Sequence, residues 1–315
     1  MTSRRMVRYA SVGVAATLAF AASIAQAENG HRQGNACVAT ASLQHGACHL
    51  GVREDMKIGN VVCLNITDKA AFNACLSEFM QTTKQAKEDC EEQFEARDDV
   101  CDLLPKGPYD PTIDPDGFVD VIDNPYAPFA PGSRWVYESR GGEGVERVEI
   151  NVLTTTREIL DIDCTIVSDN VYVDGVLIES TEDYLAQDLA GNVWYFGELS
   201  QSFEDGRLRS LDGSFTGGVN GAKPGFWMKA APARGETYRQ EWAPGEAEDM
   251  ATIVSVDADI EVPFENGGEI LQVRESTPIS PGSVEFKYFV PGVGFVLETK
   301  PGSDERLELI EYTPG

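Results

Sequence analysis

The segment that decides the fold runs from residue 37 to residue 101 and reads CVATASLQHGACHLGVREDMKIGNVVCLNITDKAAFNACLSEFMQTTKQAKEDCEEQFEARDDVC. It holds six of the seven cysteines of the chain, and the steps between them are 11, 15, 12, 15 and 11 residues. This series is the same in both directions. A chain that folds back on itself about position 69 therefore predicts three nested disulfides: Cys37 with Cys101, Cys48 with Cys90, and Cys63 with Cys75.

Residues 70–103 are predicted to form a helix, because they include no Gly or Pro and are rich in Ala, Glu, Lys and Gln. Thr67 or Asp68 would cap its start. Steps of 11 and 15 residues nearly complete whole helical turns, so the cysteines of this helix share one stripe. The same spacing aligns the cysteines of the first arm. Three glycines nevertheless predict that the first arm is partly irregular, namely Gly46, Gly51 and Gly59.

The first residues have the composition of a secretory signal, with a basic start, an apolar run over residues 10–25, and small residues at Ala25 and Ala27. We expect a signal peptide over residues 1–27. The apolar run is too short to span a membrane, and no later segment predicts a membrane span. In an oxidising compartment clustered cysteines form disulfides. The sequence therefore predicts a periplasmic or secreted protein.

The chain is strongly acidic, with 52 Asp and Glu against 25 Lys and Arg and a formal net charge of −27. Such a charge repels nucleic acid and anionic lipid, and it favours cations or basic partners. We therefore exclude nucleic acid as a partner. Solubility of an exported protein is the simpler explanation of the charge, so the charge alone identifies no ligand.

Three parts are expected after the signal peptide. Residues 28–104 form the six-cysteine helical hairpin. Residues 105–131 are rich in Pro and Asp and form an ordered, extended connector, because proline forces extended backbone on its neighbours. Residues 132–315 form a β domain.

From residue 132 onward the sequence alternates apolar and polar residues in ten or more short segments, the pattern of strands. Asp174-Gly175 lies between two apolar runs and is the strongest hairpin signal. Short strands in sequence order predict an antiparallel meander that curls to hide its edges. The fold class is therefore α+β: a disulfide-linked helical hairpin followed by a large antiparallel β-meander, as a barrel, half-barrel or sandwich.

Several segments carry a resemblance to known proteins: NPYAPFAPGSRWVYES at 124–139, NVWYFGE at 192–198 and DERLELIEY at 304–312. They resemble a group of secreted bacterial proteins of uncharacterised function in which a cysteine-bearing helical segment precedes a β domain. The resemblance implies this two-part organisation and no activity. More loosely, the PG-x-x-W-x-Y first strand is similar to the open-barrel folds of periplasmic lipid or lipoprotein carriers, an analogy of fold that does not fix function.

Aromatic residues gather in the β domain, which holds all four tryptophans. About half of them point inward on alternating strands, so the interior is either an ordinary packed core or a cavity for a small apolar molecule or a partner segment. The consecutive residues 194–196 cannot all face one core, so another element must cover one side. The leading hypothesis is a binding protein of unknown ligand. Its candidate ligand-binding residues are Trp194, Tyr195, Phe196, Trp227 and Trp242.

The connector holds a second candidate site, for Ca²⁺. With Gly117 as the tight-turn glycine of a calcium loop, four aspartates occupy ligand positions: Asp114, Asp116, Asp120 and Asp123. Thr112 takes the first position, where calcium loops have Asp, and two prolines interrupt the loop. A solvated acidic connector is the alternative. Cation binding is the second hypothesis, with Ca²⁺ as the one candidate cofactor.

The three histidines, at positions 31, 45 and 49, all precede the β domain. His45 and His49 would share one helix face, a spacing that can chelate Zn or Cu. A third ligand would come from His31 or Met56. We favour the alternative of two exposed histidines on a disulfide-linked helix, because a disulfide-bonded Cys48 offers no thiolate.

No catalytic residue is assigned from the sequence. The β domain has no histidine for a Ser-His-Asp or Cys-His site, and it has no G-x-S-x-G motif. Carboxylates alone can hydrolyse glycans, which is the third hypothesis, but no particular pair stands out. The odd cysteine, Cys164, is predicted to be a buried small residue rather than a reactive thiol.

Overall fold

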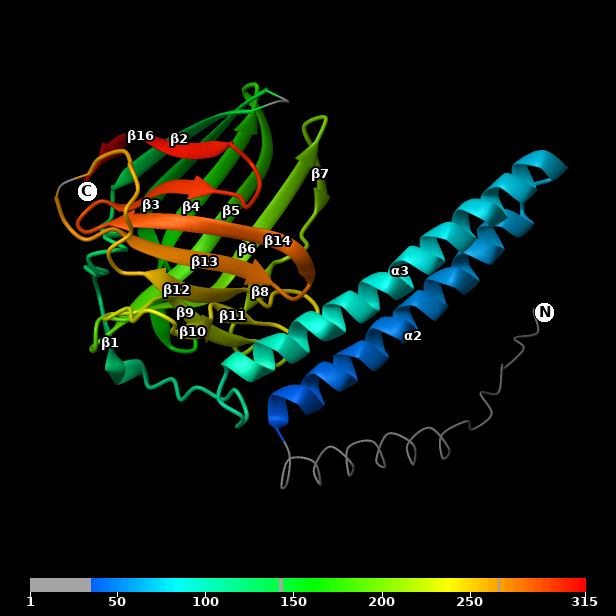
Figure 1. Ribbon diagram of the computed structural model, residues 1–315, viewed down its shortest axis with the longest axis horizontal. Coiled ribbons are helices and arrows are strands. Elements are labelled where there is room, and N and C mark those ends of the chain that lie inside the picture. Colours follow the sequence, from blue (N-terminus) through cyan, green and yellow to red (C-terminus); the bar gives the residue numbers. More distant parts are fainter. Residues whose placement is uncertain (1–34, 142–143, 266) are drawn as a thin grey trace, which may run out of the picture. The chain divides into compact units, whose positions relative to one another are not determined.

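The computed structural model describes residues 35–141, 144–265 and 267–315 (Figure 1). The predicted signal peptide and His31 lie outside the described residues. Contacts between residues divide the chain into two compact units, one up to Cys90 with Arg97–Tyr109, and one comprising Glu91–Ala96 with Asp110–Gly315. Glu91–Ala96 lie inside an uninterrupted helix. We therefore describe the helical hairpin and the β domain each by itself.

The helical hairpin consists of α2 (Ala36–Leu64) and α3 (Lys69–Leu103). The predicted second helix is confirmed. Asp68 caps it, because its side chain accepts a hydrogen bond of 2.8 Å from the backbone N–H of Ala71. None of the described helices is long and apolar enough to cross a membrane.

Three nested disulfides join the two helices, with the pairing that the mirrored spacing predicts. Their Cα–Cα distances are 5.5, 5.8 and 5.7 Å, within the usual range for disulfides. The pairs are Cys37–Cys101, Cys48–Cys90 and Cys63–Cys75.

The first arm is a continuous helix, so the prediction of a partly irregular arm is wrong. Gly59 is buried, and a Cβ at this position would lie 2.2 Å from Cδ1 of Phe79 on α3. The absence of a side chain at Gly59 thus permits close packing of the two helices. A Cβ at Gly46 or Gly51 would meet nothing within 4 Å. These two glycines destabilise the helix only through their low helix propensity, and the disulfides to α3 outweigh that effect.

The β domain is a single antiparallel sheet that curls into a nearly closed barrel (Figure 1). Strands pair in the order β10-β12-β13-β14-β15-β16-β2-β3-β4-β5-β6-β9-β11. The short strands at the two ends of this order, β10 and β11, are separated in the chain by Gln240 alone. The larger strands are β2 (Arg134–Gly141), β3 (Gly144–Ile159), β4 (Ile162–Val173), β5 (Val176–Asp188), β6 (Val193–Glu204), β12 (Met250–Ser255), β13 (Leu271–Thr277), β14 (Ser280–Val290), β15 (Gly294–Thr299) and β16 (Arg306–Thr313). The shorter ones are β1 (Phe118–Val119), β7 (Arg207–Ser210), β8 (Phe215–Thr216), β9 (Lys223–Met228), β10 (Thr237–Arg239) and β11 (Glu241–Trp242).

Buried apolar side chains form a large cluster, a smaller second one and a third around Phe215. The second cluster includes Cys164, which is fully buried and unpaired, as the sequence predicts. The connector covers this cluster, because Phe118 of β1 packs edge-on against Trp194 and Phe196. Phe118 thus covers one side of the aromatic run at residues 194–196, which cannot all face one core.

Candidate functional site

The β domain encloses a cavity of about 440 Å³, hereafter the barrel cavity. Its walls come mainly from every second residue of neighbouring strands, since successive side chains of a strand point to opposite faces. On β5, for example, Glu179, Thr181, Asp183 and Leu185 all line it.

One part of the lining is aromatic and another is acidic. The aromatic residues are Tyr126, Phe129, Trp135, Tyr137, Tyr195, Trp227, Phe289 and Phe295. Nine carboxylates also line the cavity: Glu146, Asp169, Glu179, Asp183, Glu198, Asp249, Glu275, Glu285 and Glu298. The basic residues of the lining are Lys287 and Lys300. The cavity therefore has a large excess of acidic groups.

The two lysines neutralise only a minority of these acids. Lys287 Nζ lies 2.6 Å from Glu275 Oε2, and Lys300 Nζ lies 3.8 Å from Glu285 and 3.7 Å from Glu298. Burial opposes the charge of Lys287, but the neighbouring carboxylates outweigh this effect and raise its pKa above the ordinary value. The ammonium group thus stays charged. In the described part of the chain no ion pair joins the other six carboxylates to a lysine or arginine.

A tyrosine hydroxyl lies between two of these six. The hydroxyl oxygen of Tyr195 is 2.5 Å from Asp183 Oδ1 and 3.1 Å from Glu198 Oε2. One hydroxyl proton serves only one of these contacts, so the other contact requires a proton on a carboxyl group. Burial, followed by the charge of Asp183, raises the pKa of Glu198 to about 8, which makes Glu198 the protonated partner at neutral pH. Burial raises the pKa of Asp183 to about 6, although the bond from Tyr195 opposes this rise.

Asp169 has a carboxyl group that its surroundings compensate poorly. Its Oδ1 is buried and has no hydrogen-bond partner. Burial, together with the charges of Asp183 and Glu179, raises its pKa to about 8. Asp249 shows a smaller effect in the same direction, since burial raises its pKa to about 6 while a bond from Thr277 opposes the rise.

The strand register places like charges directly opposite each other. Asp183 of β5 pairs with Glu198 of β6, and Glu275 of β13 pairs with Glu285 of β14. Such pairs destabilise a sheet, and buried unpaired acids cost still more. Perturbed acids gathered in one cavity are typical of a functional site, because folding alone gains nothing from them.

The structure separates the five aromatic residues singled out from the sequence. Tyr195 and Trp227 line the barrel cavity. Trp194 and Phe196 belong to the second apolar cluster, on the other face of β6. Trp242 is half-buried, and Lys223 Nζ lies 5.6 Å from the centre of its ring.

The four connector aspartates are not gathered around one point. Asp114 accepts a hydrogen bond from the N–H of Asp116 and caps a short 3-10 helix, whereas Asp123 accepts one of 2.6 Å from Gln187. Within residues 35–141, 144–265 and 267–315, one group of three His, Cys, Asp or Glu residues lies close enough to share an ion, and it includes none of these aspartates.

The acidic lining of the cavity was not predicted from the sequence. A signal exists in β14, where Glu285, Lys287 and Phe289 follow each other at every second position. Polar residues also occupy the outer faces of strands that line the cavity. Arg147 and Glu149 of β3, for example, alternate with the lining residues of that strand. The alternation alone therefore does not identify the inner face.

Comparison with known proteins adds no family and no fold relative. No family model matches the chain, and neither a curated protein nor a solved structure matches it.

Proposed function

We propose that this protein is a binding protein whose β domain holds a small organic cation, an amine with an apolar portion, in the barrel cavity. The excess of nine carboxylates over two lysines in one buried cavity carries the proposal. A bound ammonium group would supply positive charge and N–H donors beyond those of the two lysines, above all for the unpartnered Asp169 Oδ1.

The distribution of the acids favours an organic cation over a metal ion. Ca²⁺ requires several oxygens at 2.3–2.6 Å around one point. Among the described residues, no three cavity carboxylates come close enough to share an ion. Acids spread over several strands suit a ligand that extends through the cavity and donates hydrogen bonds at more than one place.

The aromatic residues favour an apolar portion in the same ligand. Trp135, Trp227 and Phe289 provide flat apolar surface, and ring faces also attract cations. A purely apolar ligand would leave the carboxylates unpaired. The sequence-based hypothesis of an apolar ligand is thus narrowed to a ligand that is both apolar and cationic.

The proposal keeps the expected compartment. Three disulfides are typical of proteins in oxidising surroundings, which supports a periplasmic or secreted binding protein. Asp183 and Glu198 do not suit the glycan-hydrolase hypothesis, because the hydroxyl of Tyr195 occupies the space between their oxygens where a substrate would have to enter.

Calorimetry with matched pairs of amines and alcohols tests the proposal. We expect phenethylamine to bind at least about tenfold more tightly than 2-phenylethanol, and 1,4-diaminobutane more tightly than 1,4-butanediol, because each alcohol lacks the charge. The variant D183N should reduce amine binding, whereas E158Q, at an exposed position of β3, should not. Equal affinity for amine and alcohol would favour the apolar-ligand hypothesis and contradict ours.

A further inference from the structure

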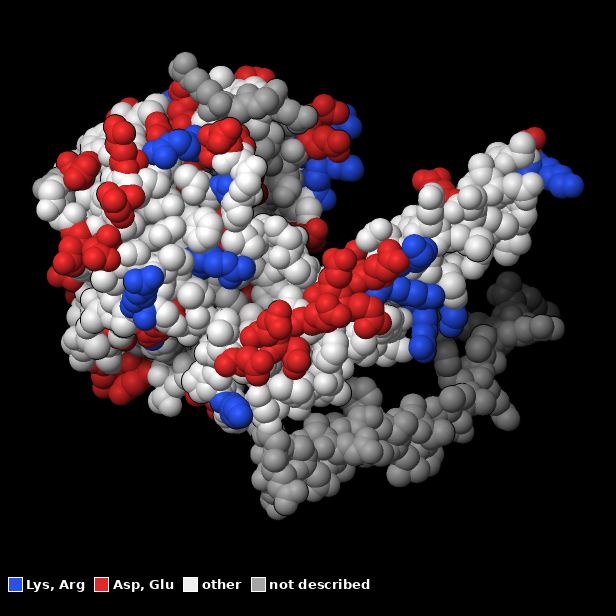
Figure 2. Space-filling view, viewed as in Figure 1, with Lys and Arg blue, Asp and Glu red and all other residues white. Residues whose placement is uncertain are grey.

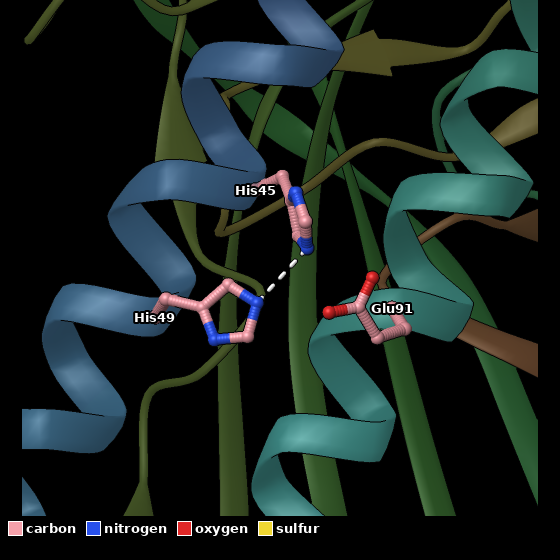
Figure 3. Close-up of side chains that lie close together, drawn as sticks. All are labelled: His45, His49 and Glu91. Carbon is pink, nitrogen blue, oxygen red and sulfur yellow. Dashed lines mark hydrogen bonds between the residues drawn. The ribbon is translucent and has the colours of Figure 1, made fainter.

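His45, His49 and Glu91 form a compact group in the helical hairpin, far in sequence from the barrel cavity. Each offers one ligand atom, and these atoms lie within 4.8 Å of one another. Figure 3 shows the two imidazoles projecting from α2 and the carboxylate of Glu91 pointing toward them from α3. Nε2 of His45 lies 3.0 Å from Nε2 of His49. From this geometry we propose a binding site for a divalent transition-metal ion, with Zn²⁺ as its probe.

The helical frame positions the three ligands. His45 and His49 are one turn apart on α2, so both rings lie on one side of the helix. Glu91 follows Cys90 directly in α3, and the Cys48–Cys90 disulfide ties that point of α3 to α2 between the two histidines. The three side chains are therefore held together by the covalent frame of the hairpin.

The ligand atoms have the spacing that a metal ion requires. Two Zn–N bonds of about 2.1 Å at a tetrahedral angle place the nitrogens about 3.4 Å apart. The two Nε2 atoms, 3.0 Å apart, need move by only a few tenths of an ångström to reach this separation. Two imidazoles and one carboxylate leave a fourth position for water. This donor set suits Zn²⁺, Ni²⁺ or Cu²⁺, whereas Ca²⁺ and Mg²⁺ prefer oxygen ligands alone.

The surroundings favour a cation as well. Exposed acidic side chains follow α3 on both sides of Glu91, and they form the red stretch along this helix in Figure 2. They are Glu88, Asp89, Glu92, Glu95, Asp98 and Asp99. Their charge raises the local cation concentration, but charge alone would not distinguish Glu91 from its neighbours. The two histidines provide that distinction.

Titration of the untagged, metal-free full chain with Zn²⁺ tests the site, with Co²⁺ absorption reporting the coordination geometry. We expect one ion per chain, and at least about a tenfold loss of affinity in H45Q, H49Q and E91Q. E92Q is the matched control, because it removes the same charge from the adjacent exposed position of α3. The affinity of E92Q for Zn²⁺ should equal that of the unmodified chain. The affinity of D169N should also be unchanged, because Asp169 lines the barrel cavity instead.

The alternative results are distinct. Equal losses in E91Q and E92Q would mean general attraction to the acidic helix and would overturn the site. Unchanged binding in H45Q and H49Q, or no saturable binding below about 100 μM, would do the same. A loss of Zn²⁺ affinity in H45Q and H49Q but not in E91Q would overturn the three-ligand site. Far-ultraviolet circular dichroism and non-reducing peptide mapping establish that each variant keeps its helices and disulfides.

Discussion

The helical hairpin and the β domain are stabilised in opposite ways. Among the buried residues of α2 and α3, Val52 is the largest apolar side chain, and the others are Ala41, Gly59, three cysteines and an arginine. The β domain instead buries two clusters rich in aromatic and branched side chains. The hairpin therefore depends on covalent links, whereas the β domain has enough buried apolar surface to tolerate an acidic cavity.

Removal of the disulfides gives the largest expected effect. Each disulfide contributes on the order of 2–4 kcal/mol, and the hairpin has little buried surface to compensate for their loss. A variant with Ala at all six hairpin cysteines should lose most of its helical signal at 222 nm at 25 °C. All four tryptophans lie in the β domain, so their fluorescence reports that part separately.

The tryptophan fluorescence of the β domain is the internal control of this experiment. The midpoint of the fluorescence transition should stay unchanged, because the β domain has its own core. A helical signal that survives removal of the disulfides would show that packing alone stabilises the hairpin, and would contradict its dependence on covalent links.

The pH dependence of stability tests the other side of the comparison. Burial raises the pKa of Asp169 and Glu198 to about 8, and that of Asp183 and Asp249 to about 6, against about 4 in an unfolded chain. Between pH 5 and 8 the folded protein then binds more protons than the unfolded chain. Its free energy of unfolding must therefore fall as the pH rises, and the four pKa shifts together correspond to a loss on the order of 10 kcal/mol. Urea unfolding followed by tryptophan fluorescence at pH 5, 6.5 and 8.5 measures this loss. Stability that rises over the same range would contradict the acidic cavity.

Neutralising a single acid should recover part of this loss. D169N removes a buried charge whose Oδ1 has no hydrogen-bond partner, and it should raise the free energy of unfolding at pH 8.5 by about 1–3 kcal/mol. At pH 5 the gain should nearly vanish, because Asp169 is already protonated there. The exposed E158Q should change stability by less than about 0.5 kcal/mol at either pH. A gain of equal size at both pH values would show that the charge of Asp169 is not its cause.

The same contrast explains what the sequence could predict. The disulfide pairing and the second helix follow from local signals, namely spacing, composition and a cap. The antiparallel strands follow from period-two alternation. The barrel cavity depends on which face of each strand turns inward, and bulges shift that alternation. In β6, Gly197 pairs with Tyr184 but Tyr195 pairs with Leu185, so Tyr195 and Glu198 both line the cavity although they are three residues apart. Glu91 was missed as a partner of the two histidines because the Cys48–Cys90 link brings several acidic residues of α3 near them, and the rotation of the two helices decides which one faces them.

The smallest expected effects come from two glycines of α2 in opposite environments. At Gly51 a Cβ meets nothing within 4 Å, so G51A should stabilise the hairpin by about 0.5–1 kcal/mol through helix propensity. At Gly59 the same Cβ would lie 2.2 Å from the ring of Phe79. G59A should therefore destabilise the hairpin by about 1–2 kcal/mol, since either the ring or the helix must move. Thermal unfolding followed at 222 nm compares the two variants, which carry the same methyl group on the same helix. A gain at both positions would mean that α2 and α3 do not pack closely at Phe79, and that the disulfides alone hold the two helices together.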